Sequence, residues 1–120
     1  MTKLALLLAI TLLQPATAPA PSDADLKSIE KLATELATRA EAGDKAFVSR
    51  LISDKADDAG AADMIDRIKR GDVARTFRSH LALRGADAAG FNYHDPSHFQ
   101  VDLKKGAGGR WALTRLSVCR

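Results

Sequence analysis

The residues best suited to acid–base chemistry gather in one short polar segment of the C-terminal half. The segment Tyr93-His94-Asp95-Pro96-Ser97-His98 holds two of the chain's three histidines, and a histidine titrates near neutral pH, as a general acid or base requires. His80 and Asp102 flank it in the sequence. His80, His98 and Asp102 are therefore the catalytic candidates, as a His–Asp pair. The competing interpretation is that the segment shapes a turn and that His98 faces solvent from the outer side of a strand.

The same segment contains the spacing of a metal-binding pair. His94 and His98 are four residues apart, but that spacing brings two ligands together on a helix, and Pro96 between them indicates a turn. Residues 106–109 are rich in glycine, yet no expected helix follows them to bind a phosphate. We predict no metal site and no cofactor.

The candidate ligand-binding residues are Arg78, Tyr93 and His94. The planar guanidinium of an arginine suits a carboxylate or phosphate, and Arg75 and Arg84 lie near Arg78 in the sequence. In an extended chain Arg78 and Arg84 would face one way and Arg75 the other, so the patch would form only in part. An ordinary solvated face is the alternative.

The N-terminus reads as a secretory leader. Lys3 supplies a positive charge, Leu4 to Leu13 form an uncharged apolar run, and small residues precede Ala18 and Ala20, as signal peptidase requires. As a helix the run would be about 15 Å long, too short for the roughly 30 Å of bilayer hydrocarbon. We expect a signal peptide over residues 1–20, no stable membrane span, and a periplasmic or secreted domain over residues 21–120.

Charge is distributed unevenly along the chain. The formal net charge is only +3, too small for a nucleic-acid partner, which calls for a concentrated basic face. Residues 21–66 carry 6 basic and 11 acidic side chains, whereas residues 67–120 carry 11 basic and 4 acidic ones. Either an acidic helical layer attracts a basic sheet layer, or the basic half faces an anionic ligand or surface.

The chain has a single cysteine, Cys119. One thiol cannot form an internal bridge, so it is either inert or pairs between two chains in a homodimer.

Three amphipathic helices are expected in the N-terminal half. The first begins at a cap formed by Ser22 or Asp23 and ends at Gly43, and Asp44 caps a second, shorter helix. A third helix ends at Gly71. The expected buried positions recur at helical spacing; they are Leu26, Ile29, Leu32, Ala33, Leu36, Ala37 and Ala40, then Phe47, Val48, Leu51 and Ile52, then Ala61, Met64, Ile65 and Ile68.

Strands are expected after Gly71, where five of the six aromatic residues lie, because aromatic residues favour strands. Apolar and polar residues alternate over residues 98–103, and residues 104–110 read as a hairpin loop. Trp111 and Leu113 are one residue out of step with Leu116 and Val118, which predicts a β-bulge near Thr114. Trp111 is expected in the core rather than as a platform for a ligand.

Residues 73–84 fit two structures. Phe77, Leu81 and Leu83 would lie on one face of a strand if Ser79 also pointed inward. Asp72 as a cap, with Val73, Phe77 and Leu81 four apart, fits a helix equally well. We favour the strand.

Helix, Gly-Asp, short helix and closing antiparallel strands resemble the nuclear transport factor 2-like (cystatin-like) superfamily. The motifs that carry the resemblance are Ala42-Gly43-Asp44, Phe99-Gln-Val-Asp-Leu103 and Gly109-Arg-Trp-Ala-Leu113. The resemblance implies an α+β fold in which N-terminal amphipathic helices pack on a curved, cone-like antiparallel sheet whose mouth binds small molecules. We expect a non-enzymatic domain that binds a small molecule or a protein partner. The alternative is a small lyase, isomerase or hydrolase that uses the His–Asp pair in the cone.

Overall fold

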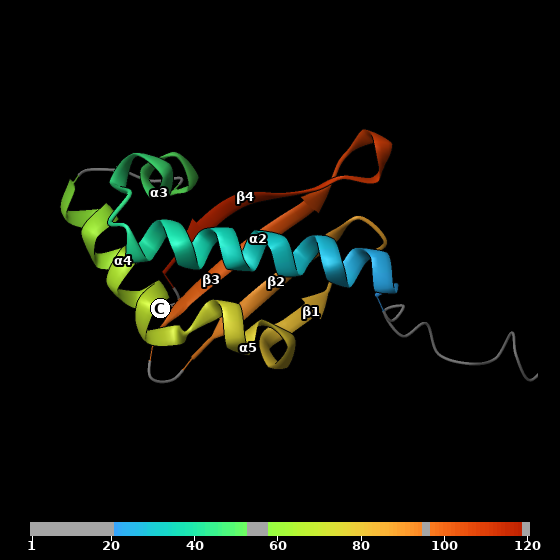
Figure 1. The fold of residues 1–120 in the computed structure, drawn as a ribbon, viewed down its shortest axis with the longest axis horizontal. Coiled ribbons are helices and arrows are strands. Elements are labelled where there is room, and N and C mark those ends of the chain that lie inside the picture. Colours follow the sequence, from blue (N-terminus) through green and yellow to red (C-terminus); the bar gives the residue numbers. More distant parts are fainter. Residues whose placement is uncertain (1–20, 53–57, 95–96, 119–120) are drawn as a thin grey trace, which may run out of the picture.

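A computed structural model describes residues 21–52, 58–94 and 97–118, and within them helices pack on one side of an antiparallel sheet (Figure 1). The helices are α2 (Asp23–Glu41), α3 (Lys45–Leu51), α4 (Asp58–Gly71) and α5 (Val73–His80), and a 3₁₀ turn, η1, covers Ala107–Gly109. The strands are β1 (Leu81–Leu83), β2 (Ala88–Tyr93), β3 (Phe99–Lys105) and β4 (Trp111–Ser117). The predicted α+β class is confirmed, whereas the cone shape is not. The predicted leader, the Asp95-Pro96 turn and Cys119 lie outside the described residues.

The helix ends follow the predicted local signals. The Ser22 hydroxyl accepts a hydrogen bond from the Asp25 amide and begins α2. Gly43 follows the helix at φ +70°, a left-handed conformation that glycine adopts without steric strain. The Asp44 carboxylate accepts from the Phe47 amide and begins α3. These three residues place α2 and α3 as the sequence predicts.

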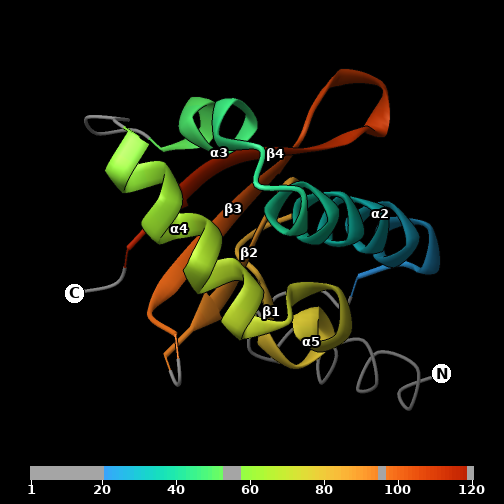
Figure 2. The same cartoon turned by 60° about the vertical axis from the view of Figure 1, so that its left-hand side comes forward.

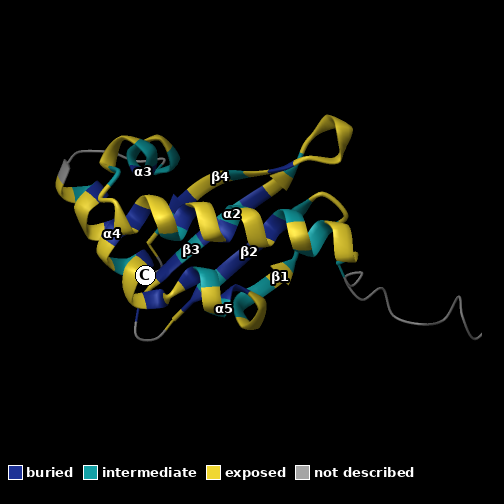
Figure 3. Cartoon of the chain, viewed as in Figure 1, coloured by how far each residue is buried: buried dark blue, intermediate teal, exposed yellow. Residues whose placement is uncertain are grey.

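The apolar stripes of the helices bury against the sheet, as Figure 3 shows. Seen in Figure 1 and, turned by 60°, in Figure 2, α2, α4 and α5 cover one face of the sheet, and α3 lies beside β4. The fully buried helical side chains that meet the sheet include Ile29, Leu36, Val48, Met64, Ile68 and Val73. Leu26, Leu32, Ala37, Phe47, Leu51 and Ile52 are only partly buried.

The sheet has the order β1-β2-β3-β4, with every neighbouring pair antiparallel. Phe99, Val101 and Leu103 are buried beneath the helices, and Gln100 and Asp102 point to the other face. This alternation confirms the predicted strand, because successive side chains of a strand point to opposite faces. Among the described residues no helix covers the second face, which we call the open face (Figure 1).

The predicted bulge lies at Thr114. Asp102 pairs with Arg115, but the next residue, Leu103, pairs with Leu113, so Thr114 is the extra residue. Its hydroxyl donates to the Asp102 carbonyl. The bulge lets both Trp111 and Leu116 bury on the helix side. Val118, which follows the strand, is exposed and does not join them.

The favoured strand over residues 73–84 is wrong for residues 73–80, which form α5, and right for β1. A strand that buries Phe77 would have turned Arg75 and Ser79 to the same face, whereas a helix buries Val73 and Phe77 together and leaves both polar side chains exposed. Asp72 precedes the helix at φ +50° with no side-chain cap hydrogen bond. The helix ends at His80 and residues 81–83 form β1, so each alternative is correct for part of the segment.

Trp111 joins the hairpin to α2. The side chain is 7% exposed, and its indole Nε1 donates to Asp25 Oδ1 at 2.9 Å. Lys105 Nζ lies 3.1 Å from the same oxygen. Trp111 is thus a core residue, as predicted, and one carboxylate connects the first turn of α2 to both strands of the hairpin.

Among the described residues, no helix is both long and apolar enough to cross a membrane.

Candidate functional site

The three catalytic candidates do not come together. His80 ends α5 on the helix side, where its ring stacks on Tyr93 with centroids 4.0 Å apart. Its Nδ1 lies 2.9 Å from the Asn92 carbonyl, and since a carbonyl oxygen only accepts, Nδ1 carries the proton and donates. Both contacts fasten α5 to β2.

Asp102 lies on the open face, with the sheet between it and His80. Its carboxylate accepts from Gln100 Nε2 at 2.8 Å and lies 3.6 Å from Arg84 Nη1. His98 is exposed just before β3, as one alternative predicted, and its carbonyl accepts from Arg67 of α4. The predicted His–Asp pair therefore does not assemble from His80 and Asp102.

The three ligand-binding candidates are also separate. Arg78 is exposed on α5, and its guanidinium lies over the Phe77 ring, 5.6 Å from the centroid. His94 is exposed at the end of β2, whereas Tyr93 is buried in the core. With residues 73–80 helical, Arg75 and Arg78 belong to the helix layer and Arg84 to the open face, so the arginine patch does not form.

Tyr93 is a structural residue. Its ring stacks on Phe99, its partner across the strands, with centroids 4.5 Å apart. Thr76 Oγ1 lies within 2.8 Å of the Gly71 and Asp72 carbonyls and 3.2 Å from Tyr93 Oη. The Thr76 hydroxyl thus connects the phenol to the backbone between α4 and α5. Burial raises the pKa of Tyr93 above its ordinary value, and the hydrogen bond to Thr76 opposes that shift only in part.

The open face carries small side chains between charged ones. Across the strands, Ala88 pairs with Lys104, which pairs with Ala112. In the next row Gly90 pairs with Asp102, which pairs with Arg115. Because residues opposite one another on a sheet are nearest neighbours, Lys104 and Asp102 each stand beside an alanine or a glycine, and space remains above the strands.

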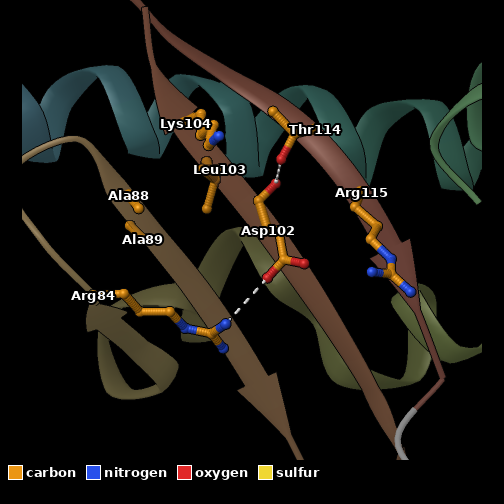
Figure 4. A pocket seen from close by; sticks show the side chains of 8 residues that line it. All are labelled: Arg84, Ala88, Ala89, Asp102, Leu103, Lys104, Thr114 and Arg115. Carbon is orange, nitrogen blue, oxygen red and sulfur yellow. Dashed lines mark hydrogen bonds and ion pairs between the residues drawn. The ribbon is translucent and has the colours of Figure 1, made fainter. Parts of the chain in front are cut away.

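This space is a pocket of about 440 Å³ (Figure 4). Its lining comes from β2, β3, β4 and the residue after β1: Arg84, Ala88, Ala89, Asp102, Leu103, Lys104, Thr114 and Arg115. The volume falls within the usual range of sites for small molecules, roughly 300–1,000 Å³. Three cationic side chains and one carboxylate give the pocket a formal charge of +2.

Arg84 is held in place over the sheet. Besides its ion pair with Asp102, Nη2 donates to Asn92 Oδ1 at 3.4 Å. A β-carbon at Gly90 would lie 3.3 Å from Nη2 and 3.1 Å from the Val101 carbonyl. The absence of a side chain at Gly90 therefore lets the guanidinium lie across β2.

Lys104 and Arg115 are the other two cations of the pocket. Both are exposed, and among the described residues neither forms an ion pair. Arg115 stands opposite Asp102 in the register, but Gln100 and Arg84 already contact that carboxylate. Within the described part of the chain, the pocket thus has one neutralised arginine and two cations that form no ion pair.

The ion pairs show how far the acidic helices contact the basic sheet directly. Within the described ranges only Lys105–Asp25 joins an acidic helix to the sheet. The other ion pairs lie within or beside one helix, or on the open face. Part of the positive charge of the C-terminal half lies on α4 and α5, and part surrounds the pocket.

The sequence offers Asp102 as a catalytic candidate and Arg84 as a possible part of an arginine patch, but it does not predict this pocket. The missing signal was the alternation of β2, in which Ala88 and Gly90 lie on the face opposite Ala89 and Phe91. Two small residues at alternate positions beside charged partners indicate a depression on a sheet, but the register must be known first.

A second hollow, of about 380 Å³, lies between α2 and the hairpin and is bordered by Lys31, Glu35, Arg110 and Trp111. Since Trp111 is nearly buried and its indole N–H is bound to Asp25, it offers little ring surface to a ligand there.

Across residues 21–52, 58–94 and 97–118, no three histidine, cysteine, aspartate or glutamate side chains are grouped as metal ligands would be. No protein-family model, curated protein or solved structure matches the chain. The resemblance to the nuclear transport factor 2-like superfamily therefore stays a prediction.

Proposed function

We propose that this protein is an exported, non-enzymatic domain that binds a small-molecule ligand on the open face of its sheet. The observation that carries the proposal is the pocket of about 440 Å³ among Arg84, Asp102, Lys104 and Arg115. Export is supported by the leader-like sequence of residues 1–20, with its charged start, apolar run and small residues.

Binding rather than catalysis is supported by the roles of the titratable groups. His80 is engaged with Tyr93 and Asn92, and Asp102 is engaged with Gln100 and Arg84 on the other face. A general acid–base mechanism needs such groups within reach of one substrate. The pocket instead offers charge, hydrogen-bond donors and an apolar floor, which are the features of a binding site.

The test is to map ligand contacts on the purified protein by amide NMR. A set of acidic, neutral and basic aromatic fragments is titrated into labelled protein, and shifts are assigned by residue. We expect the largest shifts at Ala88, Gly90, Asp102, Thr114 and Arg115. Shifts confined to the helix layer, or no fragment that binds, would overturn the proposal. Binding only by a second protein, with the same residues shifted, would replace the small molecule with a protein partner.

A further inference from the structure

We infer that the pocket on the open face recognises a small molecule through a carboxylate or phosphate group, with Arg115 and Lys104 as the recognising cations. The inference rests on the proposed function and adds the chemical class of the ligand.

The pocket has more cationic than anionic side chains in its lining. Asp102 neutralises one of its three cations, Arg84, at 3.6 Å. Lys104 and Arg115, on neighbouring strands, form no ion pair among the described residues. Two cations without a counter-ion attract an oxyanion, and their effect is strongest in a depression that excludes part of the solvent.

Asp102 does not make the pocket an acidic site. Oδ1 accepts from Gln100 and is the oxygen nearest Arg84, so this oxygen is engaged by neighbouring side chains of the sheet. Its role is to position Arg84, whose guanidinium also lies against Gly90. Figure 4 shows Arg84, Lys104 and Arg115 around Asp102 on the face away from α2.

The floor of the pocket accommodates the rest of the ligand. Ala88 and Lys104 line it, and Thr114 lies at its border on the bulge. An arginine fork binds two oxygens of a carboxylate or phosphate side by side. We therefore expect a ligand with one oxyanion toward Arg115 and a small apolar body over Ala88.

The test compares three probes of one shape: phenyl phosphate, benzoate and the neutral benzamide. Dissociation constants are measured on the purified protein from the shifts of the residues of the open face. We expect both anions to bind about tenfold more tightly than benzamide, since a charged group across an interface adds to affinity, and this preference to shrink as salt screens it.

Variants identify the recognising groups. Arg115→Gln and Lys104→Gln should each weaken phenyl phosphate binding about fivefold, in keeping with a partly exposed ion pair, and leave benzamide binding unchanged. Lys69→Gln, which removes a positive charge from the exposed side of α4, is the control and should change neither.

The outcomes separate the two proposals. Equal binding of all three probes at the open face overturns the anion preference and leaves the proposed function intact. An anion preference that survives Arg115→Gln and Lys104→Gln unchanged overturns the assignment to these cations. Shifts at other residues, with none on the open face, overturn both.

Discussion

At the scale of single residues, Asp25 connects two parts of the chain that are far apart in the sequence. Its carboxylate accepts from Trp111, 86 residues away, and pairs with Lys105. The hydrogen bond from Trp111, followed by that from Lys105, lowers the pKa of Asp25 from 3.8 to about 2. No local sequence signal predicts these partners of Asp25, because they depend on the tertiary fold.

Replacing Asp25 tests this connection. Folding lowers the pKa, so the unfolded chain takes up the proton first as the pH falls, and the stabilisation by Asp25, complete well above pH 3.8, is lost as the pH falls to about 2. Asp25→Asn should be less stable than the parent at neutral pH and should lack this part of the acid dependence. Urea unfolding at a series of pH values measures both effects.

Asp23→Asn is the control for that comparison, because it removes an exposed carboxylate from the same helical turn. Equal stabilities of Asp25→Asn and Asp23→Asn at every pH would contradict the role of Asp25.

Tyr93 gives a second prediction at this scale. It is the only tyrosine in the chain, so its ionisation can be followed directly. Burial raises its pKa above 10.0, so the folded protein holds the phenol proton longer than the unfolded chain. Stability should therefore fall as the pH rises above 10.0. The ultraviolet absorbance of tyrosinate should appear at higher pH in the folded protein than in denaturant, and coincident titrations would refute the prediction.

At the scale of elements, local signals predicted most of the structure. Ser22, Gly43 and Asp44 set the ends of α2 and α3 through contacts within a few residues. The strand favoured for residues 73–80 is wrong, and the sequence does not decide the question because Phe77 fits an inward position in either a strand or a helix. The choice depended on whether Arg75 and Ser79 would be buried, which the neighbouring α2 and β2 decide.

Removing the bulge at Thr114 should lower the stability of the fold strongly. Deleting Thr114 would restore a regular register and turn either Trp111 or Leu116 out of the core. The loss of one such buried side chain destabilises a protein by about 2–5 kcal/mol. Thr114→Ala removes only an exposed hydrogen bond and should cost about 1 kcal/mol or less.

Denaturant unfolding followed by the fluorescence of the single tryptophan, Trp111, distinguishes these two variants. A deletion variant as stable as Thr114→Ala would show that the register shift does not hold the core together.

At the scale of the whole molecule, the two faces of the sheet differ in composition. The helix-facing side of the sheet is closed by aromatic and aliphatic side chains, including Phe91, Tyr93 and Phe99. The open face instead combines small residues with arginine and lysine. The sequence showed the excess of positive charge in this half but not where it lies, because the register of all four strands determines which side chains share a face.

The central claim is that the space above Ala88 is where a ligand binds, and filling that space tests it most directly. Ala88→Phe places a ring in the pocket without changing any charge, and Ala62→Phe adds the same ring on the exposed side of α4. The decisive measurement is the affinity for phenyl phosphate of both variants, each shown to be folded by its amide spectrum. We predict that Ala88→Phe abolishes binding and Ala62→Phe preserves it; binding that survives Ala88→Phe unchanged would contradict the account.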